Sequence, residues 1–326
     1  MTLRAPHAHE GISIPTLMFK VILALLPAAV LGVLQFGVPA LLLLFTCLLT
    51  ALLCEGLCRK LNPQAEGRAN DGAALLTGLL LAMSLPPHLP LWLGALGTAI
   101  AILFGKQIYG GLGQNPFNPA MLARVVLLIA FPVQMTHWVD PAAFYDGNWY
   151  LPGVDGHSGA TLLGGFKESG HLSLNLVGQW LGTARGSMGE TSALLLVLGG
   201  LWLIWQQVFS WHVPVATLLG ALVPATLLWL INPALLPDPV SQLTGGGLLL
   251  GAFFIATDPV TSPTSSRGKL WFGAGLGALV FIIRTFGNFP EGVAFAVLIM
   301  NGATPLIDHF TRPTIYGHKV RKEEQA

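Results

Sequence analysis

Long apolar segments follow one another along almost the whole chain, and they restrict the fold more than any other feature. An apolar stretch of about 20 residues crosses the hydrocarbon core of a bilayer as a helix. We predict ten such helices, of which the third and eighth are short and end at Pro86-Pro87 and Asp258-Pro259. The predicted segments are 16–36, 38–58, 72–86, 89–109, 118–137, 190–211, 213–231, 243–257, 270–288 and 290–310. The sequence therefore predicts an all-α polytopic membrane protein in a lipid bilayer.

The composition agrees with a membrane protein and argues against one class of partner. Of the 326 residues, 53% are hydrophobic and 10% are charged, whereas about 25% are charged in an average soluble domain. The formal net charge is +1, and a nucleic-acid-binding domain carries a strongly basic face. We therefore expect no nucleic-acid partner.

Lysine and arginine residues predict the orientation, because cytoplasmic loops carry an excess of them. If the N-terminus is cytoplasmic, ten of the 16 basic residues lie in inner loops and tails, and the outer loops hold only Lys167 and Arg185. The ten inner residues are Arg4, Arg59, Lys60, Arg68, Arg267, Lys269, Arg312, Lys319, Arg321 and Lys322. We expect both termini in the cytoplasm and the long loop 138–189 in the periplasm or an equivalent outer compartment.

Two short motifs occur twice, at corresponding places in the two halves of the chain. The sequence TGLLLA at 77–82 resembles GGLLLG at 246–251, and GQNP at 113–116 resembles GNFP at 287–290. The copies are five predicted spans apart, and an odd offset inserts the two halves in opposite directions. Paired, Gly- and Pro-interrupted segments are typical of inverted repeats whose broken helices meet at the membrane midplane. The alternative is a chance similarity between leucine-rich helices.

This repeat predicts how the chain is organised. Residues 1–137 form a first five-helix repeat with a cytoplasmic N-terminus, and residues 138–189 form the outer loop. Residues 190–311 form the second, inverted five-helix repeat, and residues 312–326 form a cytoplasmic C-terminal tail.

Four charged residues fall in or beside the interrupted segments: Lys106, Arg124, Arg284 and Glu291. A charge at the centre of a bilayer costs about 3 kcal/mol even on insertion scales, so such residues usually face a polar cavity or an oppositely charged partner. Two interpretations stand. These residues line an intramembrane route for an ion or a cofactor, or they form buried ion pairs that fix the packing of the helices.

The outer loop contains a polar run, DGHSGAT, from Asp155 to Thr161. A run of Gly and Ser is by itself usually only a turn. Here the run resembles the signature at which a flavin transferase joins the phosphate of FMN to a threonine hydroxyl. Small residues leave the backbone open to that enzyme. Ser158, Gly159 and Ala160 would surround the phosphate, Asp155 would contribute to recognition, and the Thr161 hydroxyl would carry the flavin.

The chain as a whole resembles one family of membrane proteins. The resemblance rests on the ten spans, the outer threonine, the segment ATDPVTSP at 256–263 and the tail DHFTRPTIYG at 308–317. The family contains the D subunits of Rnf electron-transport complexes and the B subunits of sodium-pumping NADH:quinone reductases. One departure is Leu162, where many members have proline after the threonine.

This resemblance implies a redox component of a membrane translocase, which is not a complete enzyme alone. Electrons pass between ferredoxin and NAD, and their flow moves Na⁺ or H⁺ across the bacterial inner membrane. FMN is attached to Thr161 on the periplasmic side, and some relatives also hold a non-covalent riboflavin. The implied partners are the A, B, C, E and G components of the complex, with a flavin transferase for maturation.

A different class of function also suits inverted repeats, namely a passive channel or transporter for a small polar solute. The tripeptide Asn-Pro-Ala of water channels occurs at 118–120 and at 232–234. However, the repeat pairs residue 120 with residue 294, and we interpret the two tripeptides as a coincidence. Covalent flavin fluorescence distinguishes the redox function from the channel.

Overall fold

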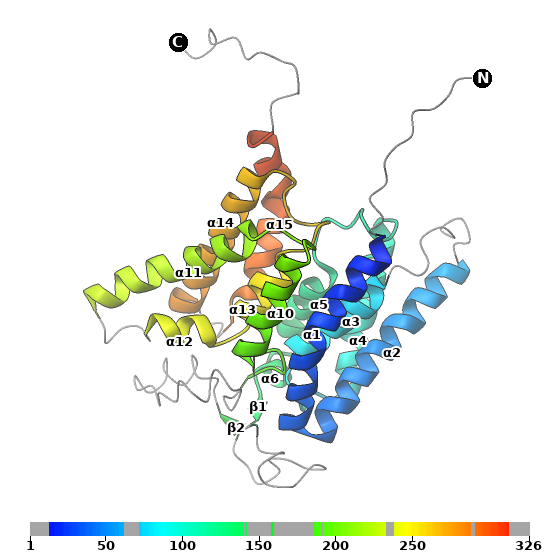
Figure 1. The fold of residues 1–326 in the computed structure, drawn as a ribbon. Helices are drawn as coiled ribbons and strands as arrows, with labels where there is room; N and C mark the ends of the chain where they lie inside the picture. Colours follow the sequence, from blue (N-terminus) through cyan, green and yellow to red (C-terminus); the bar gives the residue numbers. More distant parts are fainter. Residues whose placement is uncertain are drawn as a thin grey trace, which may run out of the picture.

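The computed structural model describes residues 13–61, 72–139, 141, 158–159, 186–190, 192–232, 238–287 and 291–312. Helices make up most of this part of the chain (Figure 1). The elements before the outer loop are α1 (Ile14–Phe36), α2 (Val38–Leu61), α3 (Ala73–Ser84), α4 (Leu91–Leu103), the 3₁₀ turn η2 (Gln107–Tyr109), α5 (Pro119–Ala130) and α6 (Pro132–Met135). A short antiparallel ladder follows, made of β1 (Trp138–Val139) and β2 (Ser158–Gly159).

The second group of helices follows the outer loop. Its elements are α10 (Ala193–Trp205), α11 (His212–Ile231), α12 (Pro239–Thr244), α13 (Leu248–Leu250), the π-helical turn η3 (Gly251–Ile255), α14 (Ser266–Phe286) and α15 (Val293–Phe310).

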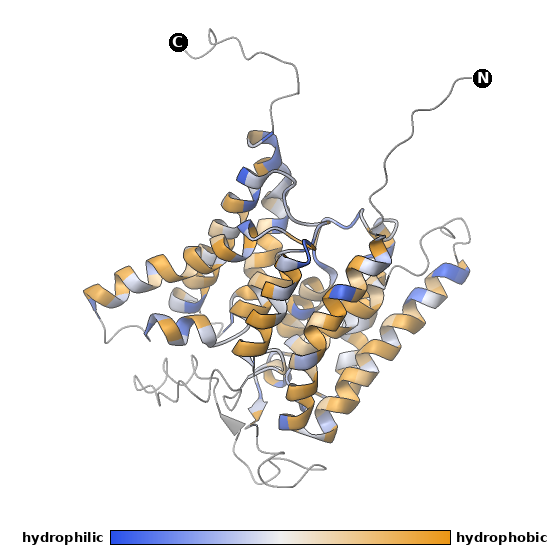
Figure 2. Ribbon diagram, viewed as in Figure 1, coloured by the Kyte–Doolittle hydropathy of each residue, from blue (hydrophilic) through white to orange (hydrophobic). Residues whose placement is uncertain are grey.

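Six stretches within the described residues are long and apolar enough to cross a membrane: α1, α2, α4 with η2, α11, α14 and α15. Three shorter apolar helices, α3, α5 and α10, lie among them. Hydrophobic residues predominate along the helices (Figure 2). Large apolar side chains such as Leu53, Phe286 and Ile231 are exposed. A side chain exposed to lipid loses nothing by being apolar. These features confirm a helical, multi-pass membrane protein.

A tight turn joins the first two helices. Ser13 begins α1, and its side-chain oxygen accepts a hydrogen bond from the backbone N–H of Thr16. Gly37 ends α1 with a φ of 73°, a conformation that favours glycine. Its N–H donates to the Val33 carbonyl, and α2 begins at the next residue. One residue therefore suffices to reverse the chain.

Small residues bring α11 and α14 into close contact. A Cβ added to Gly273 would lie 2.7 Å from the Val213 carbonyl oxygen, and one on Gly277 would overlap the Thr217 carbonyl oxygen. Gly220 on α11 packs in the same way against the backbone of Ala274. Close backbone approach at small residues is a main source of helix association in membranes. The two helices therefore pack backbone against backbone.

Three predicted segments are helical over only part of their length. Segment 118–137 is interrupted at Phe131, because Pro132 begins α6 and has no N–H to continue α5. Segment 190–211 is helical only over α10, which starts where the Ser192 hydroxyl accepts from the Leu195 N–H. Segment 243–257 is broken between α12 and α13, where Gly246 has a φ of 68°.

The helix contacts of the first group recur in the second. In the first group α2 packs against α3 and α4, and α5 packs against α3 and α4. In the second, α11 packs against η3 and α14, and α15 packs against η3 and α14. Between the groups, α1 contacts α10 and α5 contacts α15.

Basic residues lie at one end of the molecule, and the β1–β2 ladder lies at the other. The start of α1 and the end of α15 lie at one end, and the β1–β2 ladder lies at the opposite end (Figure 1). Arg59 and Lys60 end α2 at the first of these ends, and Arg267 and Lys269 begin α14 there.

Candidate functional site

The flavin-attachment motif is described only at its centre. Ser158 and Gly159 form β2, in which Trp138 is opposite Gly159 and Val139 is opposite Ser158. Trp138 and Val139 are buried and follow α6 after two residues. The ladder therefore holds the middle of the motif next to the helical part of the protein. Asp155, Ala160 and Thr161 lie outside the described residues.

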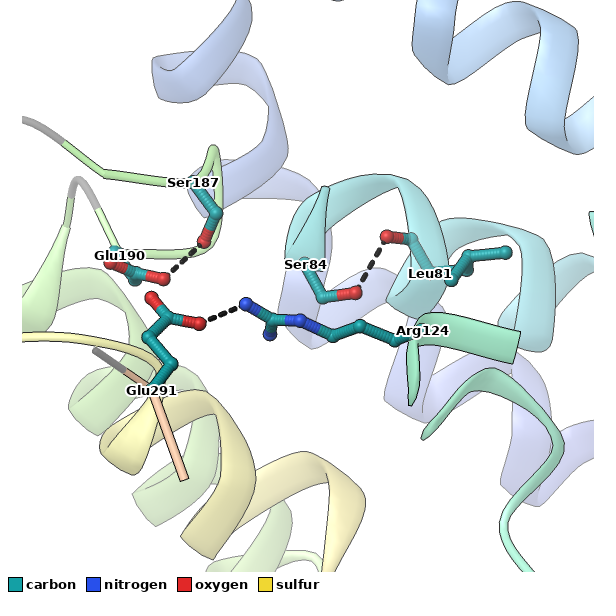
Figure 3. Close-up of polar contacts among 6 residues, drawn as sticks. All are labelled: Leu81, Ser84, Arg124, Ser187, Glu190 and Glu291. Carbon is teal, nitrogen blue, oxygen red and sulfur yellow. Dashed lines mark hydrogen bonds and ion pairs between the residues drawn. The ribbon is translucent and has the colours of Figure 1, made fainter. Parts of the chain in front are cut away.

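A buried ion pair joins the two groups of helices. Arg124 on α5 donates through Nη2 to Oε2 of Glu291, which lies two residues before α15 (Figure 3). Each side chain is 7% exposed. Both residues are among the four intramembrane charges that the sequence singles out. The structure brings them together across the contact between α5 and α15.

A second carboxylate reaches the same place from the end of the outer loop. Glu190 accepts a hydrogen bond from the Ser187 hydroxyl through Oε1, over 2.7 Å. The carboxyl groups of Glu190 and Glu291 point toward one another (Figure 3). The segment 186–190 is buried, and the Gly189 N–H donates to the Met83 carbonyl near the end of α3 over 2.7 Å. This contact places Glu190 beside the end of α3.

Arg284 near the end of α14 completes the group. Its Nη1 donates to the Gln242 carbonyl over 2.8 Å, and its side chain covers Gly246, where a Cβ would lie 2.5 Å from Nη2. A Cβ on Gly247 would lie 3.8 Å from Arg124 Nη1 and 3.9 Å from Glu190 Oε1. The two glycines leave room for these charges beside α13. We define the charge cluster as the residues Arg124, Glu190, Arg284 and Glu291.

Lys106 lies apart from the charge cluster. It follows α4 and forms an ion pair with Glu55 on α2, with 2.6 Å between Nζ and Oε1. The side chains are 3% and 12% exposed. Of the four predicted intramembrane charges, three therefore meet at one place, and the fourth belongs to a separate pair within the first group.

A pocket lies between the two groups of helices, nearer the start of α3. It is lined from the first group by α1, α3 and the residues around Asn115 and Asn118, and from the second by Phe209 and the segment from Phe254 to Pro259. Its empty volume is about 710 Å³, part of it open to solvent. Lys106 is also part of its wall.

The polar side chains of the pocket have different roles. Asn118 caps α5, because its Oδ1 accepts from the N–H groups of Ala120 and Met121. Asn115 donates to the Phe117 carbonyl, while its buried Oδ1 has no hydrogen-bond partner among the described residues. Burial raises the pKa of the Asp258 carboxyl, although hydrogen bonds from the Val260 N–H and the Thr261 hydroxyl oppose this shift.

Comparison with known proteins decides the family. A model of the NQR2, RnfD, RnfE family matches residues 1–317. The chain belongs to the NQR2, RnfD, RnfE family.

Named members of this family are similar over nearly their whole length. The D component of the ion-translocating oxidoreductase complex of Stutzerimonas stutzeri is 48% identical over 334 residues, which cover 95% of this chain and 94% of the relative. The protein of the same name in Halorhodospira halophila is 44% identical over 337 residues, covering 96% and 94%. That of Escherichia coli (strain SE11) is 44% identical over 344 residues, covering 97% of each. The resemblance inferred from the sequence is confirmed.

Two buried or partly buried acidic residues, Glu190 and Glu55, are not among the intramembrane charges predicted from the sequence. Glu190 begins the predicted span 190–211, and Glu55 lies within the predicted span 38–58. Each is an acidic residue at the edge of or within an apolar segment, which is a rare position for a charge. That signal could have found both, but it could not have named Glu291 and Lys106 as their neighbours.

Proposed function

We propose that this chain is the redox component of an ion-translocating oxidoreductase complex in the bacterial inner membrane, and that it carries FMN on Thr161. The observation that carries the proposal is the DGHSGAT motif in a member of the NQR2, RnfD, RnfE family. The names of the relatives support membership of such a complex. The other components A, B, C, E and G and a flavin transferase are the proposed partners.

The residues around Thr161 suit attachment by an external enzyme. FMN bound there supplies one- and two-electron redox chemistry, which the side chains themselves lack. Ser158 and Gly159 are held in β2 against β1, so Thr161 follows two residues after an anchored strand. The Thr161 hydroxyl forms the phosphoester and no base in this chain is needed, because the transferase performs the reaction. Asp155 and Ser158 serve recognition or the surroundings of the phosphate.

The arrangement of the chain supports a periplasmic position for Thr161. The β1–β2 ladder lies opposite the end that holds the start of α1, the end of α15 and the basic residues of α2 and α14. Positive charge favours the cytoplasmic side. We therefore place both termini in the cytoplasm and the motif outside, where it exchanges electrons with another carrier on the outer face.

We also propose that ten membrane segments form two inverted five-helix repeats. The paired contacts support this: α2 with α4 corresponds to α11 with α14, and α5 with α3 corresponds to α15 with η3. The contacts between the groups join equivalent helices, α1 with α10 and α5 with α15. Contacts between equivalent elements are expected beside a two-fold axis. In this arrangement the third and eighth segments, which contain α3 and α13–η3, are incomplete and end near the midplane.

The charge cluster lies at the junction of these halves, and we propose that it lines the route of the translocated ion, Na⁺ or H⁺. Arg124 and Glu291 come from opposite halves, and Arg284 lies beside them. Lys106 would act separately, at the wall of the pocket.

We propose the pocket between the halves as the place of the second, non-covalent flavin that the family resemblance implies. An isoalloxazine ring offers an apolar face and one N–H donor, and the wall offers apolar side chains and the buried Asn115 Oδ1 without a partner among the described residues. Asn115→Leu should remove non-covalent riboflavin from the purified chain and leave covalent flavin unchanged. Extraction of riboflavin at the wild-type yield from this variant would show that the pocket does not hold it.

Covalent flavin is tested directly by fluorescence in a denaturing gel. The full chain, expressed with an active flavin transferase, should fluoresce at its own position, and Thr161→Ala should abolish the signal. Thr136→Ala, the same substitution at the end of α6, is the matched control and should keep it. A wild-type band without fluorescence would contradict the proposal and favour the passive channel instead.

A further inference from the structure

Two buried carboxyl groups face each other in the charge cluster without a donor between them. Oε1 of Glu190 accepts from Ser187, and Oε2 of Glu291 accepts from Arg124. The other two oxygens, Oε2 of Glu190 and Oε1 of Glu291, are buried and have no partner in the described part of the chain. Glu190 is 8% exposed and Glu291 is 7% exposed. The facing carboxyls therefore present acceptors to each other.

The facing carboxyl groups of Glu190 and Glu291 are unfavourable neighbours when both are ionised. Two carboxylates that share a buried site repel each other, and the usual result is that one of them keeps a proton. A proton on one carboxyl also supplies the missing donor, because O–H on one residue can donate to the oxygen of the other. Buried acceptors without a donor are costly. One proton thus resolves both the repulsion and the missing hydrogen bond.

The contacts of the two carboxyl groups differ, and this difference bears on which of them is more easily protonated. Glu291 accepts directly from Arg124, whose positive charge favours the ionised form. Glu190 accepts only from a neutral hydroxyl, that of Ser187. The remaining charged group at this place is Arg284, which lies on Gly246; its Nε and Nη2 have no hydrogen-bond partner among the described residues, so it donates to neither carboxyl. The neutral, protonated form is therefore least costly on Glu190.

A metal cation is a poor alternative occupant of this place. The guanidinium groups of Arg124 and Arg284 lie beside the two carboxyl groups. A site for Na⁺ would need further oxygen ligands, whereas nitrogen donors of the guanidinium groups occupy this side. A proton needs only the two facing oxygens.

We propose that Glu190 and Glu291 bind one proton between them at the junction of the two halves, with the proton on Glu190. This inference deepens the proposed ion route and rests on it only for a role in translocation. The bound proton itself is a property of the resting protein and is tested without turnover or flavin.

The test compares two isosteric substitutions in the full-length chain, Glu190→Gln and Glu291→Gln. Gln resembles a protonated carboxyl, since its amide N–H₂ donates a hydrogen bond. Glu190→Gln should therefore leave the thermal midpoint of unfolding in detergent close to the wild-type value. Glu291→Gln should lower it by several degrees, because Arg124 then lacks its anion. Glu55→Gln is the control, because it makes the same substitution in the Lys106–Glu55 ion pair, outside the charge cluster.

Infrared spectroscopy detects the proton itself. The wild-type chain near neutral pH should show a carbonyl stretch of a buried protonated carboxyl, which shifts in D₂O. Both Glu190→Gln and Glu291→Gln should lose this band, since each leaves a single carboxylate next to Arg124, and Glu55→Gln should keep it. A band that persists in both variants, or that appears only when Na⁺ is removed, would overturn the proposal. So would a greater loss of stability in Glu190→Gln than in Glu291→Gln.

Discussion

Arg124 on α5 and Glu291 before α15 form an ion pair that joins the two groups of helices. Each residue is provided by a different half of the chain, and each side chain is only 7% exposed. A charge in such a place is tolerated only because its partner is present. The pair is therefore a link between the halves as well as part of the proposed ion route.

Removal of one partner should be strongly destabilising. Breaking a buried ion pair costs about 3–5 kcal/mol, because the remaining charge is left uncompensated. We expect Arg124→Gln to lower the free energy of unfolding in detergent by about this amount. The double variant Arg124→Gln/Glu291→Gln should lose less than the sum of the two single variants. Lys60→Gln on the exposed end of α2 is the control, with an expected change below about 0.5 kcal/mol. Simple additivity of the two single variants would show that the residues do not interact.

The contact between α11 and α14 predicts a contrast between two glycines of one helix. A Cβ on Gly277 would overlap the backbone of α11 at Thr217, which cannot move aside alone. Overpacking of this kind costs roughly 1–3 kcal/mol, so Gly277→Ala should lower stability by about that amount. A Cβ on Gly275 would lie 2.8 Å from Met300 Cε, the end of a flexible side chain. Gly275→Ala should therefore be nearly neutral, and equal losses in both variants would contradict the close packing of these helices.

The helices could be predicted from the sequence because apolar length alone reveals them. Segments 16–36 and 38–58 correspond to α1 and α2, which differ from them by at most three residues at either end. The interruptions at Phe131 and Gly246 were harder to place, because an apolar run stays apolar across a break. Local hydropathy does not report backbone geometry.

The charge cluster could be predicted only in part, for a different reason. Arg124, Arg284 and Glu291 are conspicuous because charges are rare in apolar segments. Their meeting depends on how distant helices pack, and nothing in the local sequence places Glu190 opposite Glu291 or Lys106 beside Glu55. The sequence therefore singled out three of the four residues of the charge cluster, whereas Glu190 and the pairing of all four required the fold.

The proposed orientation predicts which positions react with a membrane-impermeant maleimide in intact cells. In a chain whose Cys47, Cys54 and Cys58 are replaced by alanine, a cysteine at Ser169 should react without permeabilisation. A cysteine at Ser266, at the exposed start of α14, should react only after the membrane is opened. The reverse pattern would mean that the orientation is inverted, and labelling of both positions in intact cells would contradict their placement on opposite sides.

The mass of the tryptic peptide containing Thr161 tests most directly whether this threonine carries FMN. In chain isolated from cells with an active flavin transferase, we expect this peptide to be heavier than its sequence by one FMN less one water, with fragmentation placing the addition on Thr161. Thr161→Ala should yield the unmodified peptide while the chain remains in the membrane fraction. An unmodified wild-type peptide, or an addition located on Ser158, would contradict attachment at Thr161.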